Sequence, residues 1–304
     1  MTISTIAFLD PERGTTRTID DNREIAEKYL HIAGERRSDI AVLPEMFLYR
    51  GVPNTNDNLK NWAQETPGSD TEFFGEIAQA HSMYIICPLH QRVGDVFYNA
   101  SVLIDRQGEV VGAYHKTHPV PVEVTEWGTA LGESIPVFDT DFGKISMMIC
   151  FDIYYPELVR VQTLKGAEIV FWSTMTSGPT EFTLETQLLA RAIDYNVFMV
   201  ESNYIEPPPY RLWQHAGQHH GRAKVVDRSG SILADTGHHD GVATATVDLA
   251  ESRWDIVPPV PIGDESPESI KTNTIAEDYL RCRRPELYGE IVAPLNGSHY
   301  ENDQ

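Results

Sequence analysis

Cys150 is the residue of this sequence whose type and position first suggest catalysis. It follows the apolar run 144–149 and precedes a stretch in which Pro156 begins a helical pattern, so the chain turns from strand to helix at the thiol. A helix N-terminus favours the thiolate form of a nearby cysteine. The pattern therefore predicts a nucleophile, although a small buried core residue is the other interpretation of a single cysteine.

Glu45 and Lys116 also stand at the ends of predicted strands. Glu45 follows the apolar run 40–43 and precedes Met46 and Phe47, and burial among such neighbours would raise its pKa toward that of a usable general base. Lys116 follows a hairpin pattern directly, where its ammonium could stabilise a developing oxyanion. Taken singly, a surface acid and a solvated lysine explain these two residues as well.

The elements that must position these residues alternate between strand and helix patterns, which indicates an α/β protein. Asp20 or Asp21 can cap one helix, and Ser69 with Glu72 has the form of a capping box for another. The strand patterns cover residues 3–9, 40–43, 83–87, 144–149 and 169–171. Because these strands are nearly continuous apolar runs, we expect two sheets packed face to face with helices outside, in a four-layer α-β-β-α sandwich.

Two segments of the chain repeat each other. Residues 101–112 and 223–234 both read as hairpins in which Gly108 or Gly230 supplies a left-handed residue at the turn. This repetition predicts a molecule of two matching halves.

The helix and strand patterns weaken beyond about residue 252, where prolines and polar residues dominate. We therefore expect one catalytic domain over residues 1–252. Residues 253–304 are expected to form a C-terminal arm that packs on a neighbouring subunit, or a loosely ordered tail.

The composition excludes several classes of protein. The chain has 304 residues with 24 Lys and Arg against 45 Asp and Glu, a net charge of −21, and such acidity argues against a nucleic-acid partner. No run approaches the roughly 18 apolar residues of a membrane span, and the first residues lack the pattern of a secretion signal. The three widely spaced cysteines do not form a disulfide framework. We therefore expect a cytoplasmic protein without a membrane partner.

The three candidate residues together resemble a known family. Leu-Pro-Glu45, Tyr-His-Lys116-Thr-His and Met-Ile-Cys150-Phe-Asp, in this order, are similar to motifs of the carbon–nitrogen hydrolase, or nitrilase, superfamily. The resemblance covers roughly residues 3 to 250. It implies an α-β-β-α sandwich, a Glu-Lys-Cys triad and a homodimer or higher homo-oligomer. Members of this superfamily often add a second glutamate before a glycine, for which we choose Glu126, with Glu123 as the alternative.

The resemblance implies hydrolysis of a small amide or carbamoyl compound without a metal or an organic cofactor. Glu45 would take the proton of Cys150, whose thiolate would attack the carbonyl carbon to give a thioester that water then cleaves. Lys116 and the backbone N–H of Phe151 would hold the oxyanion. Glu126 would orient the substrate or the lysine.

Residues near the cysteine bear on the substrate. Cys150-Phe151-Asp152 is typical of amide-cleaving members, whereas nitrilases usually continue with Trp and Glu. N-carbamoyl amino acid hydrolases often carry an arginine just beyond the Asp, and this chain has none there, so that substrate requires Arg222 or Arg211 to supply the charge. Arg222 could instead form a surface ion pair.

Further pocket residues are expected after the strand 169–171. Trp172, Ser173, Thr174 and Met175 should line the cleft opposite Cys150. The histidines of the chain lack the spacing of a metal site, so no metal is expected. Three other functions stay open: a nitrilase, an acyltransferase that uses the same triad, and a non-catalytic assembly protein.

Overall fold

The computed structural model describes residues 1–11, 16–52, 61–175, 181–205, 222–250 and 283–293. The chain divides into two units, Met1–Leu249 and Ala250–Gln304. In the second unit, the described residues form the short helices η4 (Pro285–Leu287) and α8 (Gly289–Val292). Within the described ranges, no helix is both long and apolar enough to cross a membrane.

The described part of the first unit alternates strands with helices. Its strands are β1 (Thr2–Leu9), β2 (Ile40–Val42), β3 (Tyr84–Val93), β4 (Val96–Ile104), β5 (Val110–His115), β6 (Phe138–Thr140), β7 (Gly143–Ile149), β8 (Ile169–Ser173), β9 (Phe198–Ile205), β10 (Lys224–Val226), β11 (Ile232–Asp235) and β12 (Gly241–Thr246). Its helices are α1 (Ile19–Glu35), η1 (Phe47–Tyr49), α3 (Ser69–His81), α4 (Pro121–Thr125), η2 (Cys150–Tyr154), α5 (Pro156–Leu164) and α6 (Glu181–Tyr195).

The strands build two halves with the same topology. In one half, β1, β2 and β3 are parallel and the hairpin β4–β5 continues antiparallel from β3. In the other, β7, β8 and β9 are parallel and the hairpin β10–β11 continues antiparallel from β9. One further strand in each half pairs antiparallel with its first parallel strand: β12 with β1, and β6 with β7. Because β6 follows β5 in the chain and β12 follows β11, each of these strands joins the sheet of the other half. The halves join where Ala7–Leu9 pair with Asn203–Ile205.

The two hairpins repeat each other down to their turns, as the sequence predicts. Gly108 and Gly230 are left-handed, with φ of 87° and 85°. The Asp105 carboxylate accepts the backbone N–H groups of residues 107 and 109, and the Asp227 carboxylate accepts those of residues 229 and 231. Each aspartate therefore satisfies the backbone donors of its own turn.

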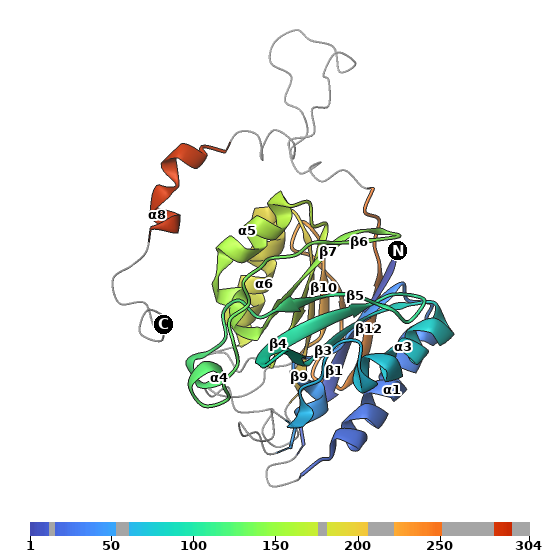
Figure 1. Cartoon of the computed structure of the whole chain (residues 1–304). Coiled ribbons are helices and arrows are strands. Elements are labelled where there is room, and N and C mark those ends of the chain that lie inside the picture. The colour runs from blue at the N-terminus through green and yellow to red at the C-terminus, as the bar shows by residue number, and fades with distance from the viewer. Residues whose placement is uncertain (12–15, 53–60, 176–180, 206–221, 251–282, 294–304) are drawn as a thin grey trace, which may run out of the picture. The chain divides into compact units, whose positions relative to one another are not determined.

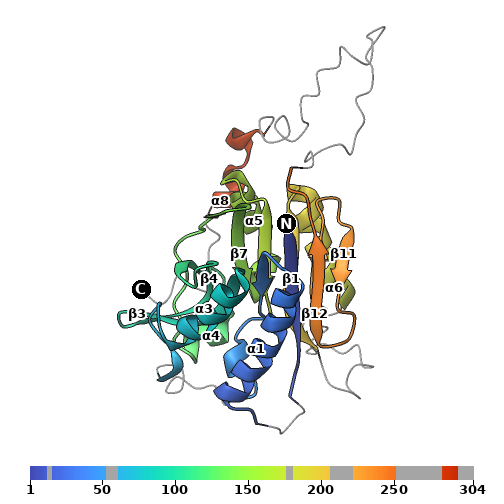
Figure 2. The same cartoon turned by 90° about the vertical axis from the view of Figure 1, so that its right-hand side faces the viewer.

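Helices cover the outer face of each sheet. Figure 1 shows α1 and α3 on one side of the strands and α5 and α6 on the other. Figure 2 shows β12 beside β1, with α1 packed over them. The expected four-layer α-β-β-α sandwich is thus confirmed.

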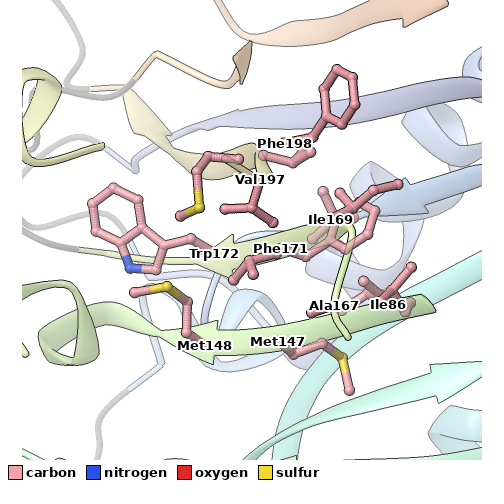
Figure 3. Close-up of a cluster of buried hydrophobic side chains, with 14 of the residues drawn as sticks. Ile86, Met147, Met148, Ala167, Ile169, Phe171, Trp172, Val197 and Phe198 are labelled. Atoms are coloured by element: carbon pink, nitrogen blue, oxygen red, sulfur yellow. The ribbon is translucent and has the colours of Figure 1, made fainter. Parts of the chain in front are cut away.

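The side chains of the first sheet alternate between two apolar clusters. Ile40 and Val42 of β2 face the cluster that continues into the second sheet, whereas Ala41 faces the cluster under α1 and α3. Figure 3 shows part of the former cluster, including Trp172 and Met148 from the neighbouring strands β8 and β7. Because both faces of these strands are buried, the strands end at fixed positions, and the residues just beyond them are held in place.

Two helix starts differ from the predictions. The cap of α1 is Thr18 rather than Asp20 or Asp21, and the Asp21 side chain completes a capping box by accepting the Thr18 N–H. Ser69 is the first residue of α3, whose cap is Gly68. In both cases the helix begins one to three residues from the expected position, because another residue makes the cap contacts.

Candidate active site

The candidate active site is built from residues that follow four different strands. Glu45 lies three residues after β2, Lys116 directly after β5, Cys150 directly after β7 and Met175 two residues after β8. All four line one pocket of about 230 Å³. Glu45, Lys116 and Cys150 therefore lie in one pocket.

Cys150 stands in a tight turn at the point where β7 ends and η2 begins. Its φ is +46°, in the left-handed region that residues with a side chain rarely adopt. Its carbonyl oxygen accepts a hydrogen bond from Trp172 Nε1 at 3.0 Å. The side chain is half-buried and opens into the pocket. A strained turn that presents a nucleophile is a recurring feature of active sites.

Glu45 is only 1% exposed, and three donors hold its carboxylate. Oε1 accepts Asn99 Nδ2 at 2.8 Å and Lys116 Nζ at 3.0 Å, and Oε2 accepts the Met175 N–H at 3.1 Å. Burial raises the pKa of Glu45 above its ordinary value, an effect that the positive charge of Lys116 opposes and the negative charge of Glu123 reinforces. A raised pKa suits a general base that must also return its proton.

Lys116 is equally buried and lies between two carboxylates. Its Nζ is 3.0 Å from Glu45 Oε1 and 2.7 Å from Glu123 Oε2. Burial alone would lower its pKa, but the negative charges of Cys150, Glu45 and Glu123 outweigh burial and raise the pKa well above its ordinary value. Lys116 is therefore a fixed positive charge beside the thiol.

Glu123, and not Glu126, is the second glutamate in this pocket. Glu123 is 2% exposed, and its Oε2 accepts both Lys116 Nζ and the Val120 N–H. Glu126 directly follows the short helix α4 and is exposed to solvent. Glu123 therefore takes the place that we predicted for Glu126. Pro121 begins α4, so Glu123 is the third residue of the helix, where an acidic side chain can accept the backbone N–H that precedes the helix. The spacing of Pro121 and Glu123 in the sequence could have indicated this role.

Asn99 links the two glutamates and was not predicted to have a role of its own. Its Nδ2 donates to Glu45 Oε1 and to Glu123 Oε1, each at 2.8 Å. Its backbone carbonyl also accepts the Lys116 N–H at 2.9 Å. Asn99 therefore holds both acids and the lysine backbone in one arrangement.

The remaining walls of the pocket are mostly apolar or aromatic. The pocket is lined by Glu45, Met46, Lys116, Val120, Glu123, Trp127, Cys150, Phe151, Tyr154 and Met175. Of the predicted pocket residues, Phe151 and Met175 are in this lining. Trp172, Ser173 and Thr174 are buried beneath it, where Trp172 supports the Cys150 turn and Ser173 Oγ donates to the Leu43 carbonyl.

Arg222 makes ion pairs away from this pocket. Its guanidinium lies 3.0 Å from Glu181 Oε1 and 2.5 Å from Asp235 Oδ2. Of the two interpretations offered for Arg222, the structure therefore shows the ion pair. Arg211 lies outside the described residues. Among the described residues, no three His, Cys, Asp or Glu side chains are grouped so as to hold a metal.

The chain is similar to known amidases. Residues 5–254 match the carbon–nitrogen hydrolase family. A 2-oxoglutaramate amidase of Bacillus subtilis is 27% identical over 76% of this chain and 85% of its own length. A deaminated glutathione amidase of Synechocystis is 29% identical over 75% of this chain and 86% of its own length.

A solved structure shows the same fold. The amidase of a Nesterenkonia species is 20% identical, with a TM-score of 0.72 over 96% of both chains. Because the family match covers most of the chain, the protein belongs to the carbon–nitrogen hydrolase family and is a hydrolase of carbon–nitrogen bonds.

Proposed function

We propose that this enzyme hydrolyses small neutral amides through a thioester on Cys150. The observation that carries this proposal is the shared pocket, in which a strained cysteine faces a buried Glu45–Lys116 pair. Amide resonance weakens the carbonyl as an electrophile and the amine as a leaving group, so a nucleophile, a proton carrier and an oxyanion donor are all required. The three residues supply these groups.

The first half of the reaction acylates the enzyme. Glu45 takes the proton from the Cys150 sulfur, and the sulfur electron pair attacks the carbonyl carbon while the C=O electron pair moves onto oxygen. Lys116 Nζ and the Phe151 N–H stabilise this oxyanion. When the oxyanion collapses, the C–N bond breaks, Glu45 gives its proton to the nitrogen, and ammonia or an amine leaves.

The second half regenerates the thiol. Glu45 takes a proton from water, and the resulting hydroxide attacks the thioester carbonyl. Collapse of the second tetrahedral intermediate breaks the C–S bond, the proton returns to sulfur, and the carboxylic acid leaves. Glu123 acts on Lys116, because its 2.7 Å contact holds the ammonium in place.

The charges of the pocket favour an uncharged substrate. The described lining contains two carboxylates and one ammonium, and the ammonium is already paired with both acids. A substrate carboxylate would meet two negative charges at short range and low dielectric. The walls formed by Met46, Trp127 and Met175 instead suit an apolar acyl group.

A cysteine-dependent amidase must fail when the thiol is removed. We expect Cys150→Ala to abolish ammonia release from butyramide, by about 10⁴-fold or more. Cys87→Ala is the control, because Cys87 is fully buried under α3 and should leave turnover intact. Mass spectrometry of quenched wild-type enzyme should find the acyl group on Cys150, and an adduct on Cys87 or Cys282 would contradict the assignment.

The substrate class is tested with compounds of similar size. Butyramide and succinamate differ mainly by a terminal carboxylate, and we expect kcat/KM for butyramide to be at least about 10-fold higher. Equal values would show that another part of the chain neutralises the carboxylate. Turnover of butyronitrile without turnover of butyramide would select a nitrilase, and transfer to added hydroxylamine in preference to water would select an acyltransferase.

We also propose that the enzyme is a cytoplasmic homo-oligomer. Leu164 of α5 and Phe182 and Ile193 of α6 are 40%, 79% and 48% exposed, and exposed apolar side chains of this size favour self-association. The free thiol of Cys87 fits a reducing compartment. Sedimentation velocity of wild type and Phe182→Glu tests the association, since the variant should shift toward monomer.

A further inference from the structure

The Asp152 carboxylate ties together the two segments that carry Cys150 and Lys116. It is fully buried, two residues after Cys150. Oδ2 accepts the Ile149 N–H at 2.8 Å and the Tyr114 hydroxyl at 2.6 Å. Oδ1 accepts the His118 N–H at 3.1 Å and lies 2.9 Å from His118 Nδ1 and 3.2 Å from Thr117 Oγ1. Each oxygen therefore has at least two donors.

The contact with Ile149 stabilises the turn of the nucleophile. Cys150 requires a positive φ, which costs free energy for a residue with a side chain. Asp152 binds the backbone just before Cys150, and Trp172 Nε1 binds the Cys150 carbonyl. These two contacts bracket the turn from both sides.

The other contacts fix the segment of the lysine. β5 ends at His115, and the next residue, Lys116, pairs its backbone N–H with the Asn99 carbonyl and its carbonyl with the Gly132 N–H. Tyr114 precedes it and Thr117 and His118 follow it, and all three bind the same carboxylate. The ring of His118 also stacks on Tyr155, with centroids 3.8 Å apart. Asp152 thus fixes the residues on both sides of Lys116, in addition to the backbone contacts of Lys116 itself.

We propose that Asp152 is a positioning residue that sets the Cys150 sulfur and the Lys116 ammonium in register for attack on the substrate. This proposal rests on the proposed function, in which these two groups act on one carbonyl. Asp152 touches neither the pocket nor the substrate, and it acts through the backbone of one segment and the side chains of the other. Its loss therefore reduces the rate of attack more than the affinity for substrate.

Asp152→Asn is a sharp test, because the side chain keeps its shape and loses one acceptor. If the amide nitrogen takes the place of Oδ1, it meets the His118 N–H, and if it takes the place of Oδ2, it meets the Ile149 N–H and the Tyr114 hydroxyl. Either orientation brings donors against donors. The matched control is Gln162→Met, because Gln162 is also fully buried and its Nε2 donates to the Met147 carbonyl of the same strand, β7.

Three quantities are measured for both variants: the Tm, kcat and KM with butyramide, and the rate at which iodoacetamide alkylates Cys150. We expect both variants to lower the Tm. Asp152→Asn alone should reduce kcat and the alkylation rate, each by about 100-fold, with KM within about threefold of wild type. If kcat and alkylation of Asp152→Asn stay within threefold of Gln162→Met, Asp152 is only structural and the proposal is wrong.

Tyr114→Phe keeps the proposal testable if Asp152→Asn does not fold. It removes one donor to Oδ2 and should reduce kcat and alkylation by about 10-fold, and unchanged values would overturn the proposal. Cys150→Ala separates this inference from the proposed function. If that variant still turns over butyramide, the proposed function fails, whereas an inactive Cys150→Ala with a fully active Asp152→Asn refutes the positioning role alone.

Discussion

The two halves of the molecule each bury a lysine beside glutamates at a repeated hairpin, yet only one of these lysines reaches the pocket. Lys116 follows the hairpin β4–β5 and contacts Glu45 and Glu123. Lys224 begins the hairpin β10–β11, is 3% exposed, and lies 3.2 Å from Glu201 and 3.4 Å from Glu185.

Both lysines have a raised pKa for the same reason. For each, burial lowers the pKa and neighbouring carboxylates more than reverse this effect. What distinguishes Lys116 is the thiol in the same pocket, since Cys150 is the largest of the influences that raise its pKa. A buried Lys–Glu pair is therefore not by itself a sign of catalysis, because an ion pair that holds β10 against α6 has the same local features.

The largest expected effect is that of Lys116→Met. Methionine keeps the length of the side chain and removes the charge that would face the oxyanion, so kcat/KM for butyramide should fall by about 10²- to 10³-fold. The loss should persist well below the Tm of the variant, because unfolding is not its cause. Ammonia release and circular dichroism at the same temperature check this, and activity within tenfold of wild type would remove Lys116 from the mechanism.

A second, smaller difference is expected between two glutamates three residues apart. Glu123→Gln weakens the contact that holds Lys116 and should reduce kcat by about 10-fold. Glu126→Gln is the matched control, because Glu126 is exposed and should leave kcat unchanged. The opposite ranking would identify Glu126 as the glutamate that supports Lys116.

The strand ends could be predicted because their apolar runs stop abruptly. The runs before Glu45 and Cys150 correspond to β2 and β7. Because these strands lie in different halves, the convergence of the two residues was implied by the family resemblance and not by the strand patterns. The hairpin before Lys116 was visible from its repeated turn. The apolar runs and the hairpin turn are local features of the sequence, whereas the positions of the other site residues depend on packing in the core.

The sequence could not predict toward which face of the sheet each side chain of a buried strand points. All of β8 is buried, so its sequence shows no alternation to indicate which residues point toward the pocket. The sequence therefore predicts Trp172 as part of the pocket wall, whereas it lies below Cys150 and donates to the Cys150 carbonyl. Asn99 carries no such pattern either, and its bridge between two acids depends on a contact across 54 residues.

Lys224→Met should show the reverse of Lys116→Met, with a loss of stability and little loss of activity. The substitution leaves Glu201 buried without its cation, which should lower the free energy of unfolding by about 3 kcal/mol. We expect kcat for butyramide to stay within about twofold of wild type, because Lys224 is not among the described residues of the pocket. Urea unfolding and ammonia release measure the two effects, and a large fall in kcat would end the distinction between the two lysines.

The smallest effect concerns pH and tests whether Glu45 is the base. Glu45 must be ionised to take the proton of Cys150, so kcat/KM should fall tenfold per pH unit below the pKa of Glu45. Because burial raises that pKa, the fall should begin above the ordinary carboxyl value of 4.5. The charge of Glu123 adds to the rise, so Glu123→Gln should lower the pKa of Glu45 and move the acid limb to lower pH. Profiles of kcat/KM for wild type and variant decide this, since a limb that stays in place or moves upward would mean that a group other than Glu45 limits the reaction at low pH.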